Sequence, residues 1–372
     1  MSEVNRVGVV IGKWINYGVE TLVFNCYRHV DKEKIQFDFI IDEDSVGIPR
    51  DEIESMGGRV IIVPPYQKIN KYISELTKLF KKNKYKIVHA HISTLSVFPL
   101  YAAKKAGVPI RIAHCHTTAG KGEVFKNIMK YSLRPLSKIF PTHLAASSRL
   151  GGEWLFGNGC FETYDMYYLP VARDVETFTY NKKVRDTVRT ELGINNKFAI
   201  GHFGRFVAQK NHSFLIDVFK EIKSIEPNAV LLLAGDGELL NETKEKVSNL
   251  NLTNSVQFLG KRNDVAQLYQ ALDVFVLPSL YEGVPGVGIE AQSAGLPFVF
   301  SDTITEEVRI LDTSKRLSFK DGVKQWAEII VSLKGATREN KIKEMTEAGY
   351  NIKAAAKNLQ QYYMTSIEKN NK

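Results

Sequence analysis

Cysteine is scarce in this chain of 372 residues, which has three: Cys26, Cys115 and Cys160, far apart and odd in number. Their spacing argues against a disulfide framework and predicts free thiols in a reducing cytoplasm. Long apolar runs are missing too. No stretch approaches the roughly 20 apolar residues of a membrane span, and the opening "MSEVNRVGVVIG" lacks the pattern of a signal peptide.

Several nucleotide and nucleic-acid motifs are also absent. No GxxxxGK(S/T) sequence occurs, which argues against a P-loop, and the turn Gly235-Asp236-Gly237 lacks the third glycine of a dinucleotide fingerprint. No recognised nucleic-acid-binding motif appears, and the basic residues are expected on helices of an enzyme-like domain. We therefore expect neither a nicotinamide cofactor nor a nucleic-acid partner.

The positive charge is unevenly spread. The net charge is +9, but residues 51–150 alone hold 17 basic and 5 acidic residues, a balance of +12. Such an excess favours an anionic partner, for example a phosphate or an anionic lipid. A surface that is merely solubilising is the alternative.

Apolar, β-branched runs alternate with longer amphipathic stretches, and the pattern occurs twice. Continuous apolar strands separated by helices predict parallel sheets buried on both faces. We therefore predict an α/β fold of two Rossmann-like, doubly wound parallel-sheet domains that face a cleft, with ligands at the carboxyl ends of the strands. The runs are "RVGVVIG", "FDFIID", "RVIIVP", "KIVHAH", "IRIAHCH" and "THLAAS", then "FAIGHFGR", "AVLLLAGDG", "VQFLGK", "VFVLPS" and "PFVFSD".

The pattern pauses between Tyr167 and Arg185, where Pro170 and a charged segment interrupt it, so an interdomain linker is predicted there. The first domain is predicted to span residues 1–170 and the second residues 171–350. The tail, about residues 351–372, is expected to form a helix that packs back on the first domain.

Two stretches of the second half combine glycine with charge. In "GHFGRFVAQKNH", Gly201 and Gly204 let the backbone approach a ligand, while Arg205 and Lys210 suit a diphosphate. In "EGVPGVGIEAQSAGLP", a glycine-rich loop runs into a helix whose N-terminus predicts an anion seat. Glu282 and Glu290 flank that seat and are expected to accept hydrogen bonds from sugar hydroxyls. Surface cations at a turn and solvated acids are the alternatives.

These stretches, with "NAVLLLAGDGEL", "VQFLGKRNDV" and "ALDVFVLPSLYEGVPGVGIEAQSAGLPFVFSD", resemble the donor domain of the retaining glycosyltransferases of family 4. That family has the two-Rossmann GT-B architecture, and these motifs are most similar to those of its bacterial exopolysaccharide and capsule branch. Glu282 and Glu290 stand in the family's E-x7-E spacing. The resemblance implies that Glu282 reaches the donor sugar and that Glu290 holds the ribose, while backbone near Lys261 to Asn263 meets the base.

The resemblance implies two sets of site residues and no metal. The catalytic set is His116, Glu282, Arg205 and Lys210. The donor-binding set is Gly18, Gly204, Arg205, Lys210, Lys261, Arg262, Glu282, Gly283, Val284, Gly286, Val287 and Glu290, and the amide of Gly288 is expected to join the anion seat.

The first half matches the family more loosely. "INYGVETLVFN" resembles the family's glycine loop, with Tyr17 in place of the first glycine and with Gly18 and Glu20 retained. "RIAHCHTT" resembles the stretch whose histidine approaches the donor sugar, here His116. In "LPVARDVETF", Ala172-Arg173 replaces the usual Asn-Gly of the hinge.

Histidine pairs support a different function. "HAH" (His89, His91) and "HCH" (His114, His116) end two neighbouring predicted strands, where residues i and i+2 share a face. Paired imidazoles can bind zinc, as in a metallohydrolase, but no carboxylate completes either cluster, which favours core or cleft histidines. "DED", residues 42–44, imitates the metal-binding DxD of other glycosyltransferases and is expected to be an acidic loop.

The segment "GEVFKNIMKYSLRPLSKIFP", residues 122–141, has basic residues every four positions: Lys126, Lys130, Arg134 and Lys138. Apolar side chains follow another side. A basic amphipathic helix is typical of a membrane-surface element. A core-packed helix with a solvated basic face is the alternative.

The sequence therefore predicts a retaining hexosyltransferase that uses a nucleotide sugar, expected to be UDP-linked, and a lipid-linked oligosaccharide acceptor in cell-surface polysaccharide synthesis. Arg205, Lys210 and a helix N-terminus would meet the leaving-group charge, so no metal or other cofactor is expected. The enzyme is expected in the cytoplasm, peripheral on the inner face of the plasma membrane. A nucleotide-sugar epimerase of the same architecture is the alternative.

Overall fold

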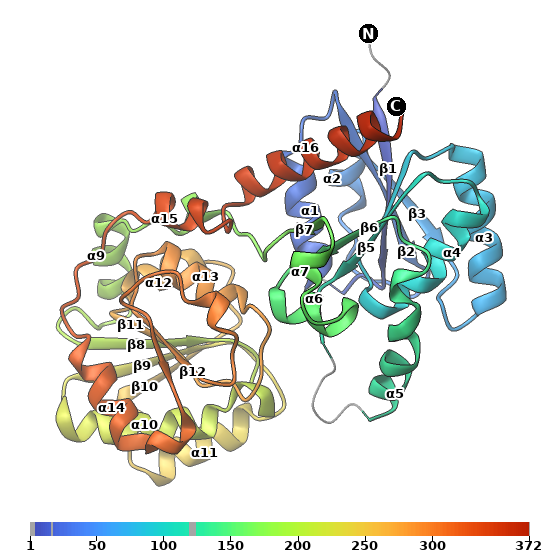
Figure 1. The fold of residues 1–372 in the computed structure, drawn as a ribbon. Coiled ribbons are helices and arrows are strands. Elements are labelled where there is room, and N and C mark those ends of the chain that lie inside the picture. Colours follow the sequence, from blue (N-terminus) through green and yellow to red (C-terminus); the bar gives the residue numbers. More distant parts are fainter. Residues whose placement is uncertain (1–3, 16–17, 119–123, 372) are drawn as a thin grey trace. The chain divides into compact units, whose positions relative to one another are not determined.

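The computed structural model describes residues 4–15, 18–118 and 124–371, with only the backbone of residues 124–126, and it divides into two compact units (Figure 1). The first unit comprises Met1–Ala172 together with Ile352–Lys372, and the second comprises Arg173–Asn351. The C-terminal helix α16 (Ile352–Asn370) thus belongs to the first unit, where it packs against α1 (Val19–His29).

The first unit contains a parallel sheet whose described strands number seven, in the order β3-β2-β1-β4-β5-β6-β7. The strands are β1 (Asn5–Gly12), β2 (Ile35–Asp42), β3 (Arg59–Val63), β4 (Ile87–Ala90), β5 (Ile110–Cys115), β6 (His143–Ala146) and β7 (Met166–Tyr168). The other helices are α2 (Arg50–Ser55), α3 (Ile69–Asn83), α4 (Val97–Lys105), α5 (Val124–Leu133), α6 (Arg149–Phe156) and α7 (Cys160–Thr163), with 3₁₀ turns η1 (Ser93–Ser96) and η2 (Arg134–Lys138).

The second unit contains a parallel sheet whose described strands number six, in the order β10-β9-β8-β11-β12-β13. The strands are β8 (Phe198–Phe203), β9 (Ala229–Ala234), β10 (Val256–Gly260), β11 (Val274–Leu277), β12 (Phe298–Ser301) and β13 (Lys315–Leu317). The helices are α8 (Val175–Phe178), α9 (Lys182–Glu191), α10 (His212–Ile225), α11 (Leu240–Asn249), α12 (Val265–Ala271), α13 (Gly286–Ser293), α14 (Gly322–Ser332) and α15 (Ile342–Glu347). The 3₁₀ turns are η3 (Ala208–Lys210), η4 (Thr253–Ser255), η5 (Glu306–Val308) and η6 (Phe319–Asp321).

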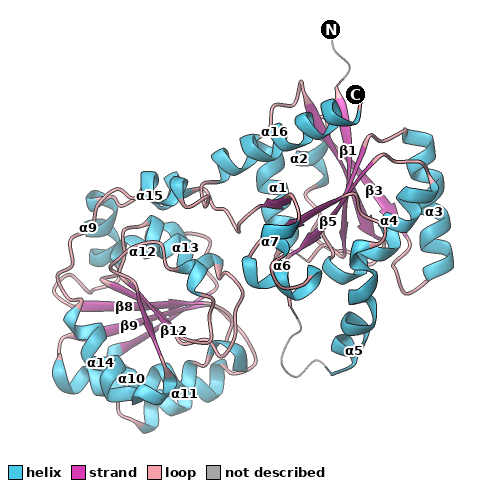
Figure 2. Cartoon of the chain, in the orientation of Figure 1, coloured by secondary structure: helices cyan, strands magenta, loops and turns pink. Residues whose placement is uncertain are grey.

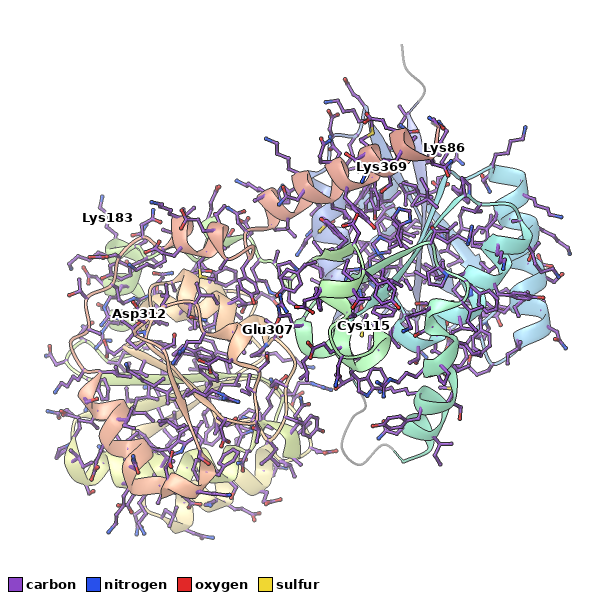
Figure 3. The ribbon with its side chains drawn as sticks, in the orientation of Figure 1. Lys86, Cys115, Lys183, Glu307, Asp312 and Lys369 are labelled. Atoms are coloured by element: carbon purple, nitrogen blue, oxygen red, sulfur yellow. The ribbon has the colours of Figure 1, made fainter. Side chains whose placement is uncertain are left out.

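Helices cover both faces of each sheet (Figure 2), which explains the continuous apolar runs. In β1, Val7 and Val9 join one hydrophobic core, which α1 and α16 complete, whereas Val10 joins the core beneath α3 and α4. Alternate residues of one strand are therefore buried on opposite faces. The three cysteines are free and buried, and Cys115 lies inside the first unit while Lys86 and Lys369 lie at its surface (Figure 3).

Two strands and part of the linker differ from the sequence prediction. The edge strands β7 and β13 have three residues each and were not predicted, because such short strands carry no apolar run of their own. The predicted linker, Tyr167 to Arg185, is largely structured: it holds the end of β7, all of α8 and the start of α9. The chain passes from one unit to the other at Ala172 and Arg173.

The order of strands places a topological switch point between β1 and β4 in the first unit and between β8 and β11 in the second. Consecutive connections on either side of such a point leave the sheet in opposite directions, which opens a crevice at the carboxyl ends of the strands. The predicted site residues follow these strands.

Candidate active site

In the second unit, the loops that follow β8 and β11 are bonded to each other. The amide of Leu280 donates to the carbonyl oxygen of Gln209 at 2.8 Å, and Gln209 Nε2 donates to the carbonyl oxygen of Tyr281 at 2.9 Å. These bonds hold Lys210 beside Glu282, with Lys210 Nζ 2.6 Å from Glu282 Oε1. The two predicted site residues therefore form one ion pair.

The Lys210–Glu282 pair is largely buried, since the two side chains are only 15% and 13% exposed. Each charge is compensated by the other at the switch point of the sheet. Arg205, by contrast, is exposed and makes no side-chain hydrogen bond or ion pair with the part of the chain that the structure describes. It is available to an anion without breaking an existing contact.

Close backbone approach at this edge requires glycine. Gly235 has φ +144°, and a Cβ atom there would lie 1.9 Å from the carbonyl oxygen of Gly204. The loop after β9 can therefore pack against the loop after β8 only if residue 235 has no side chain.

Glu290 lies on α13 and is bonded through both of its oxygens. Oε1 accepts a hydrogen bond from Arg173 Nε at 3.0 Å, and Oε2 accepts one from the hydroxyl of Tyr269 at 3.2 Å. Burial raises the pKa of Glu290, and the Arg173 charge and both hydrogen bonds oppose that increase. The carboxylate is thus held in a fixed orientation in the second turn of α13.

Arg173 contacts the predicted site residue Glu290, and the sequence indicated only that it departs from the family's hinge. A Cβ atom on Gly286 would lie 1.8 Å from Arg173 Nη2, so this glycine makes room for the guanidinium. An arginine in place of the usual Asn-Gly was the available signal, but its partner, Glu290, is distant in the sequence.

The predicted anion seat at the start of α13 is smaller than expected. The amides of Gly286 and Val287, in the first turn, have no backbone acceptor among the described residues. The amide of Gly288, however, donates to the carbonyl oxygen of Pro285 at 3.0 Å, and Gly288 is buried against Phe298. The expectation that the Gly288 amide faces an anion was therefore wrong, because the first helical turn already uses it.

Apart from Gly18, which lies in the first unit, the remaining residues of the predicted donor set lie at the same edge of the second sheet. Gly283 is exposed, whereas Val284 and Val287 are half-buried against the core. Lys261 and Arg262 follow β10 and are exposed, with Lys261 Nζ 3.5 Å from Asp236 and Arg262 Nε 2.7 Å from Asp264. The contact of the backbone near Lys261 to Asn263 with a base stays a prediction.

Buried polar atoms at this edge lack partners among the described residues. They are Nε2 of His202, both ring nitrogens of His212 and the hydroxyl of Ser279. Burial lowers the pKa of His202 and brings that of His212 to about 4, so both rings are neutral near pH 7. The sequence predicted no role for His202 or His212, and no motif pointed to these unpartnered ring nitrogens.

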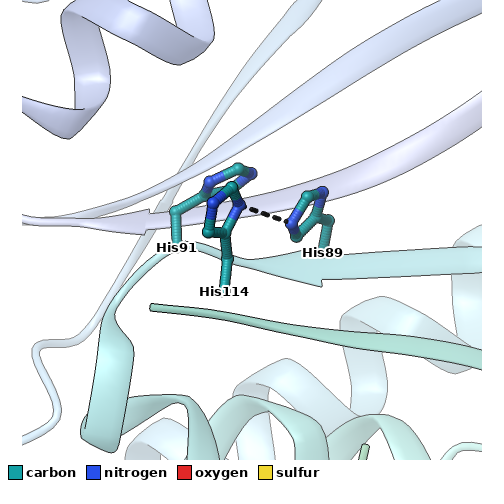
Figure 4. A group of neighbouring side chains, drawn as sticks. All are labelled: His89, His91 and His114. Carbon is teal, nitrogen blue, oxygen red and sulfur yellow. Dashed lines mark hydrogen bonds between the residues drawn. The ribbon is translucent and has the colours of Figure 1, made fainter. Parts of the chain in front are cut away.

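In the first unit, the four histidines at the ends of β4 and β5 are brought together, and all are buried or half-buried. Figure 4 shows three of them, His89, His91 and His114. His89 Nε2 lies 3.1 Å from His114 Nδ1, and His91 Nδ1 lies 3.0 Å from His116 Nε2. Burial lowers the pKa of all four rings, that of His116 to about 3, so they are neutral imidazoles.

The zinc hypothesis has a geometric basis here. His89, His91 and His114 offer nitrogens that all lie within 4.8 Å of one another (Figure 4). Imidazole suits zinc, but His89 Nε2 and His114 Nδ1 already bond each other, so a metal ion would have to replace that hydrogen bond.

The glycine loop of the first unit is described only in part, because Tyr17 lies outside the described residues. Gly18 precedes α1, and the buried Glu20 accepts a hydrogen bond from the amide of Ile15 at 3.2 Å. In the DED sequence, Asp42 ends β2, where burial and Asp44 raise its pKa to about 6, while Asp44 pairs with Lys13 at 2.6 Å.

The predicted amphipathic helix of residues 122–141 is shorter than expected. Gly122 lies outside the described residues, as does the side chain of Lys126. Helix α5 ends at Leu133 and η2, which contains a proline, follows. The other three basic residues of this segment contact the protein. Lys130 donates to the carbonyl oxygen of Thr118. Arg134 lies over the ring of Trp154, and Lys138 lies over the ring of Tyr164.

Comparison with known proteins extends over the whole chain. The family model described as glycosyl transferases group 1 matches residues 184–352, and that described as glycosyltransferase family 4 matches residues 17–151. EpsF of Bacillus subtilis (strain 168), named as a glycosyltransferase, is 36% identical over 378 residues, which cover 99% of this chain and 98% of EpsF. A galactosyltransferase of Escherichia coli, named UDP-Gal:alpha-D-GlcNAc-diphosphoundecaprenol alpha-1,3-galactosyltransferase, is 33% identical over 62% of each chain.

Two solved structures share the fold. Anabaena Alr3699/HepE in complex with UDP superposes with a TM-score of 0.74 at 18% identity, covering 96% of this chain and 95% of that one. Sucrose-phosphate synthase from Thermosynechococcus elongatus gives a TM-score of 0.77 at 16% identity, covering 98% and 99%. The predicted GT-B fold and family resemblance are thereby confirmed: the chain belongs to the family 4 glycosyltransferases and is a hexosyltransferase of polysaccharide biosynthesis.

Proposed function

We propose that this enzyme transfers a hexosyl unit from a UDP-linked sugar to a lipid-linked oligosaccharide, with retention of configuration at the anomeric carbon. The observation that carries the proposal is the largely buried Lys210–Glu282 pair, at the switch point of the second sheet and in the same unit as the unbonded amides of α13. A cation and free amides suit a diphosphate, and a carboxylate suits a sugar hydroxyl.

Each charged group has a proposed role. Arg205, Lys210 and the amides of Gly286 and Val287 meet the diphosphate, Glu290 accepts hydrogen bonds from the ribose, and Glu282 accepts one from the donor sugar. As the glycosidic bond breaks, negative charge grows on the leaving phosphate, and the same cations stabilise it. The leaving phosphate oxygen helps to deprotonate the acceptor hydroxyl. These groups supply the charge that a divalent metal would otherwise provide.

The names of similar proteins support the substrate classes. The Escherichia coli relative is named for a UDP-galactose donor and a diphosphoundecaprenol-linked acceptor, and Anabaena HepE has been solved with UDP and with UDP-glucose. A relative in Staphylococcus aureus is named for capsular polysaccharide biosynthesis.

A lipid-linked acceptor requires the enzyme to reach a membrane, and we propose that it binds the inner face of the plasma membrane peripherally. None of the described helices is long and apolar enough to cross a bilayer. On α5, η2 and the residue that follows η2, exposed side chains lie close to basic residues in the sequence: Ile128, Tyr131, Leu136 and Ile139. Apolar side chains beside cations suit an anionic lipid surface.

The test is a transfer assay with purified enzyme, UDP-glucose or UDP-galactose, and a short synthetic glycan on a diphospholipid. Transfer that requires both substrates, with the α-anomer of the donor retained in the product by NMR, supports the proposal. Appearance of an epimerised nucleotide sugar without acceptor would instead favour the epimerase, and hydrolysis that EDTA abolishes and zinc restores would favour the metallohydrolase. The variant Glu282→Gln serves as the inactive control.

A further inference from the structure

Four imidazoles and two hydroxyl groups form one unbranched hydrogen-bonded chain through the first unit. The bonded pairs lie 2.7 to 3.1 Å apart. The chain leads from helix α16 to the carboxyl ends of β4 and β5, in the order Tyr363, His89, His114, Ser147, His116 and His91. The proposed function assigns a role to none of them, although the family resemblance implies one for His116.

Every ring nitrogen of the chain has a partner except Nε2 of His91, which is buried. Each neutral imidazole has one N–H donor and one acceptor nitrogen, so a donor at one ring dictates the tautomer of the next. The protons can therefore be arranged in only two ways, one in each direction along the chain.

In the first direction, the hydroxyl of Tyr363 donates to His89 Nδ1, and every ring carries its proton on Nε2. The hydroxyl of Ser147 accepts a hydrogen bond from His114 Nε2 and donates one to His116 Nδ1. All donors are satisfied except the N–H at His91 Nε2.

In the second direction, every ring carries its proton on Nδ1, and His89 donates to the oxygen of Tyr363. The Tyr363 hydroxyl then has no acceptor among the described residues, in a side chain that is 0% exposed. Nε2 of His91 is unsatisfied as well, now as an acceptor. A buried donor without a partner is destabilising enough to favour the first direction by roughly tenfold or more.

The residues at the open end of the chain line a cavity, although Nε2 of His91 is itself buried. His91 and His116 both line a cavity of about 240 Å³, whose other polar lining residues are Tyr66, Ser93, Thr94, Thr117 and Lys130. Ser93 adopts φ 50°, unusual for a residue other than glycine, and its hydroxyl accepts the amide proton of His116 at 3.1 Å. The backbone at this wall is thus held in a demanding conformation next to the histidines.

We propose that Tyr363 is a positioning residue: its hydroxyl sets one direction of proton donation through the chain and so holds His116 as the Nε2–H tautomer. The role of His116 towards a sugar rests on the family resemblance. The direction of the chain does not, because it follows from the hydrogen bonds of the free protein. The same arrangement disfavours zinc, which needs nitrogen lone pairs.

The test is nitrogen-15 NMR of the full-length protein labelled at histidine, without substrate, so that absence of transferase activity would leave the result unaffected. In the wild type, we expect pyrrole-type Nε2 and pyridine-type Nδ1 signals for all four rings. In Tyr363→Phe, which keeps the ring, both directions leave two unsatisfied atoms, so the tautomer ratio at His91 and His116 should fall by roughly tenfold towards a mixture. Neighbouring Tyr362 supplies the matched control, because its buried hydroxyl has no partner among the described residues and Tyr362→Phe should leave the spectrum unchanged.

Three results would overturn the proposal. The first is a wild-type spectrum with Nδ1–H tautomers or with charged rings at His91 and His116. The second is a Tyr363→Phe spectrum identical to that of the wild type. The third is stoichiometric zinc in the purified protein, with metal-shifted nitrogens at His89, His91 and His114. The wild-type spectrum alone decides the first and third points, even if the variant were unstable.

Discussion

The Lys210–Glu282 pair makes a prediction about nucleotide binding that goes against simple intuition. Glu282→Gln removes the carboxylate charge while keeping the size of the side chain. Lys210 would then remain largely buried without a counter-charge, because its ammonium lies 2.6 Å from the carboxylate in the intact pair. We expect the variant to be less stable than the wild type, to bind UDP more tightly, and to transfer sugar poorly.

The magnitude follows from the burial of the pair. Two unit charges 4 Å apart interact by about 4 kcal/mol at an effective dielectric constant of 20, before the cost of removing them from water is subtracted. Removing one partner of a fully buried pair costs about 3–5 kcal/mol. Because these side chains are 13–15% exposed, we expect a smaller loss, about 2 kcal/mol. That loss corresponds to a fall in Tm of roughly 4–8 °C for a unit of this size.

Bound UDP should return part of this stability, because its diphosphate gives Lys210 a new counter-charge. A gain of about 1.4 kcal/mol in binding would lower the Kd tenfold. Calorimetry measures the Kd. Thermal unfolding without UDP measures the loss of stability in the variant, and thermal unfolding with UDP measures how much of it is recovered. The matched control is Asp217→Asn, which breaks a surface pair of the same length with Lys246 in the same unit. It should change neither UDP affinity nor transfer.

Weaker UDP binding by Glu282→Gln than by the wild type would refute this reasoning, since it would mean that the carboxylate itself holds the nucleotide. An unchanged Tm in the absence of UDP would refute it as well. That result would show that the buried lysine needs no counter-charge.

The remaining predictions concern the other charged groups and the proposed membrane surface. Arg205→Gln should weaken UDP binding by roughly tenfold without lowering the Tm, because the side chain has no partner in the described structure; calorimetry and thermal unfolding separate the two effects. Since burial raises the pKa of Glu290 and the ribose needs its ionised form, UDP affinity should fall as the pH drops through that raised pKa. Arg173→Gln should move this fall to a higher pH, measured by UDP titrations across pH, and an unshifted profile would mean that Arg173 does not act on Glu290. Thorough EDTA treatment should leave transfer unchanged, and a loss that added magnesium or zinc reverses would count against a metal-independent mechanism. Replacing Ile128 and Ile139 by Gln should reduce sedimentation with anionic liposomes, and added salt should reduce the sedimentation of the wild type. Equal pelleting of the wild type and the variant would rule out this surface as the membrane contact.

Most of the fold was predictable because it depends on periodicity. Every strand of four or more residues coincides with an apolar run in the sequence, since a parallel strand buried on both faces must be apolar throughout. The two strands that escaped prediction, β7 and β13, lie at sheet edges and have three residues each. An edge strand of that length buries too little to leave a pattern.

The candidate site was predictable to the extent that its residues are close in sequence to a strand end. Lys210 and Glu282 follow β8 and β11, and neighbouring parallel strands bring them together. Their direct ion pair was not predicted, because it depends on how two loops bond to each other. Arg173 and Tyr363 were missed for a stronger reason: each meets its partner across more than a hundred residues of chain.

The two units compensate their buried polar groups in different ways: the second unit uses an ion pair, and the first uses hydrogen bonds between neutral side chains. This difference fits the proposed ligands. A diphosphate is an anion, so the second unit needs a cation at its strand edge, and pairing Lys210 with Glu282 keeps that cation compensated when no ligand is bound. The hydroxyl of a sugar is neutral, and the first unit accordingly has neutral imidazoles that satisfy one another through hydrogen bonds. Charges attract an anion over a distance that depends on salt, whereas neutral donors act only at contact. Affinity for UDP should therefore weaken with ionic strength, while the tautomers of the histidine chain should not respond to it.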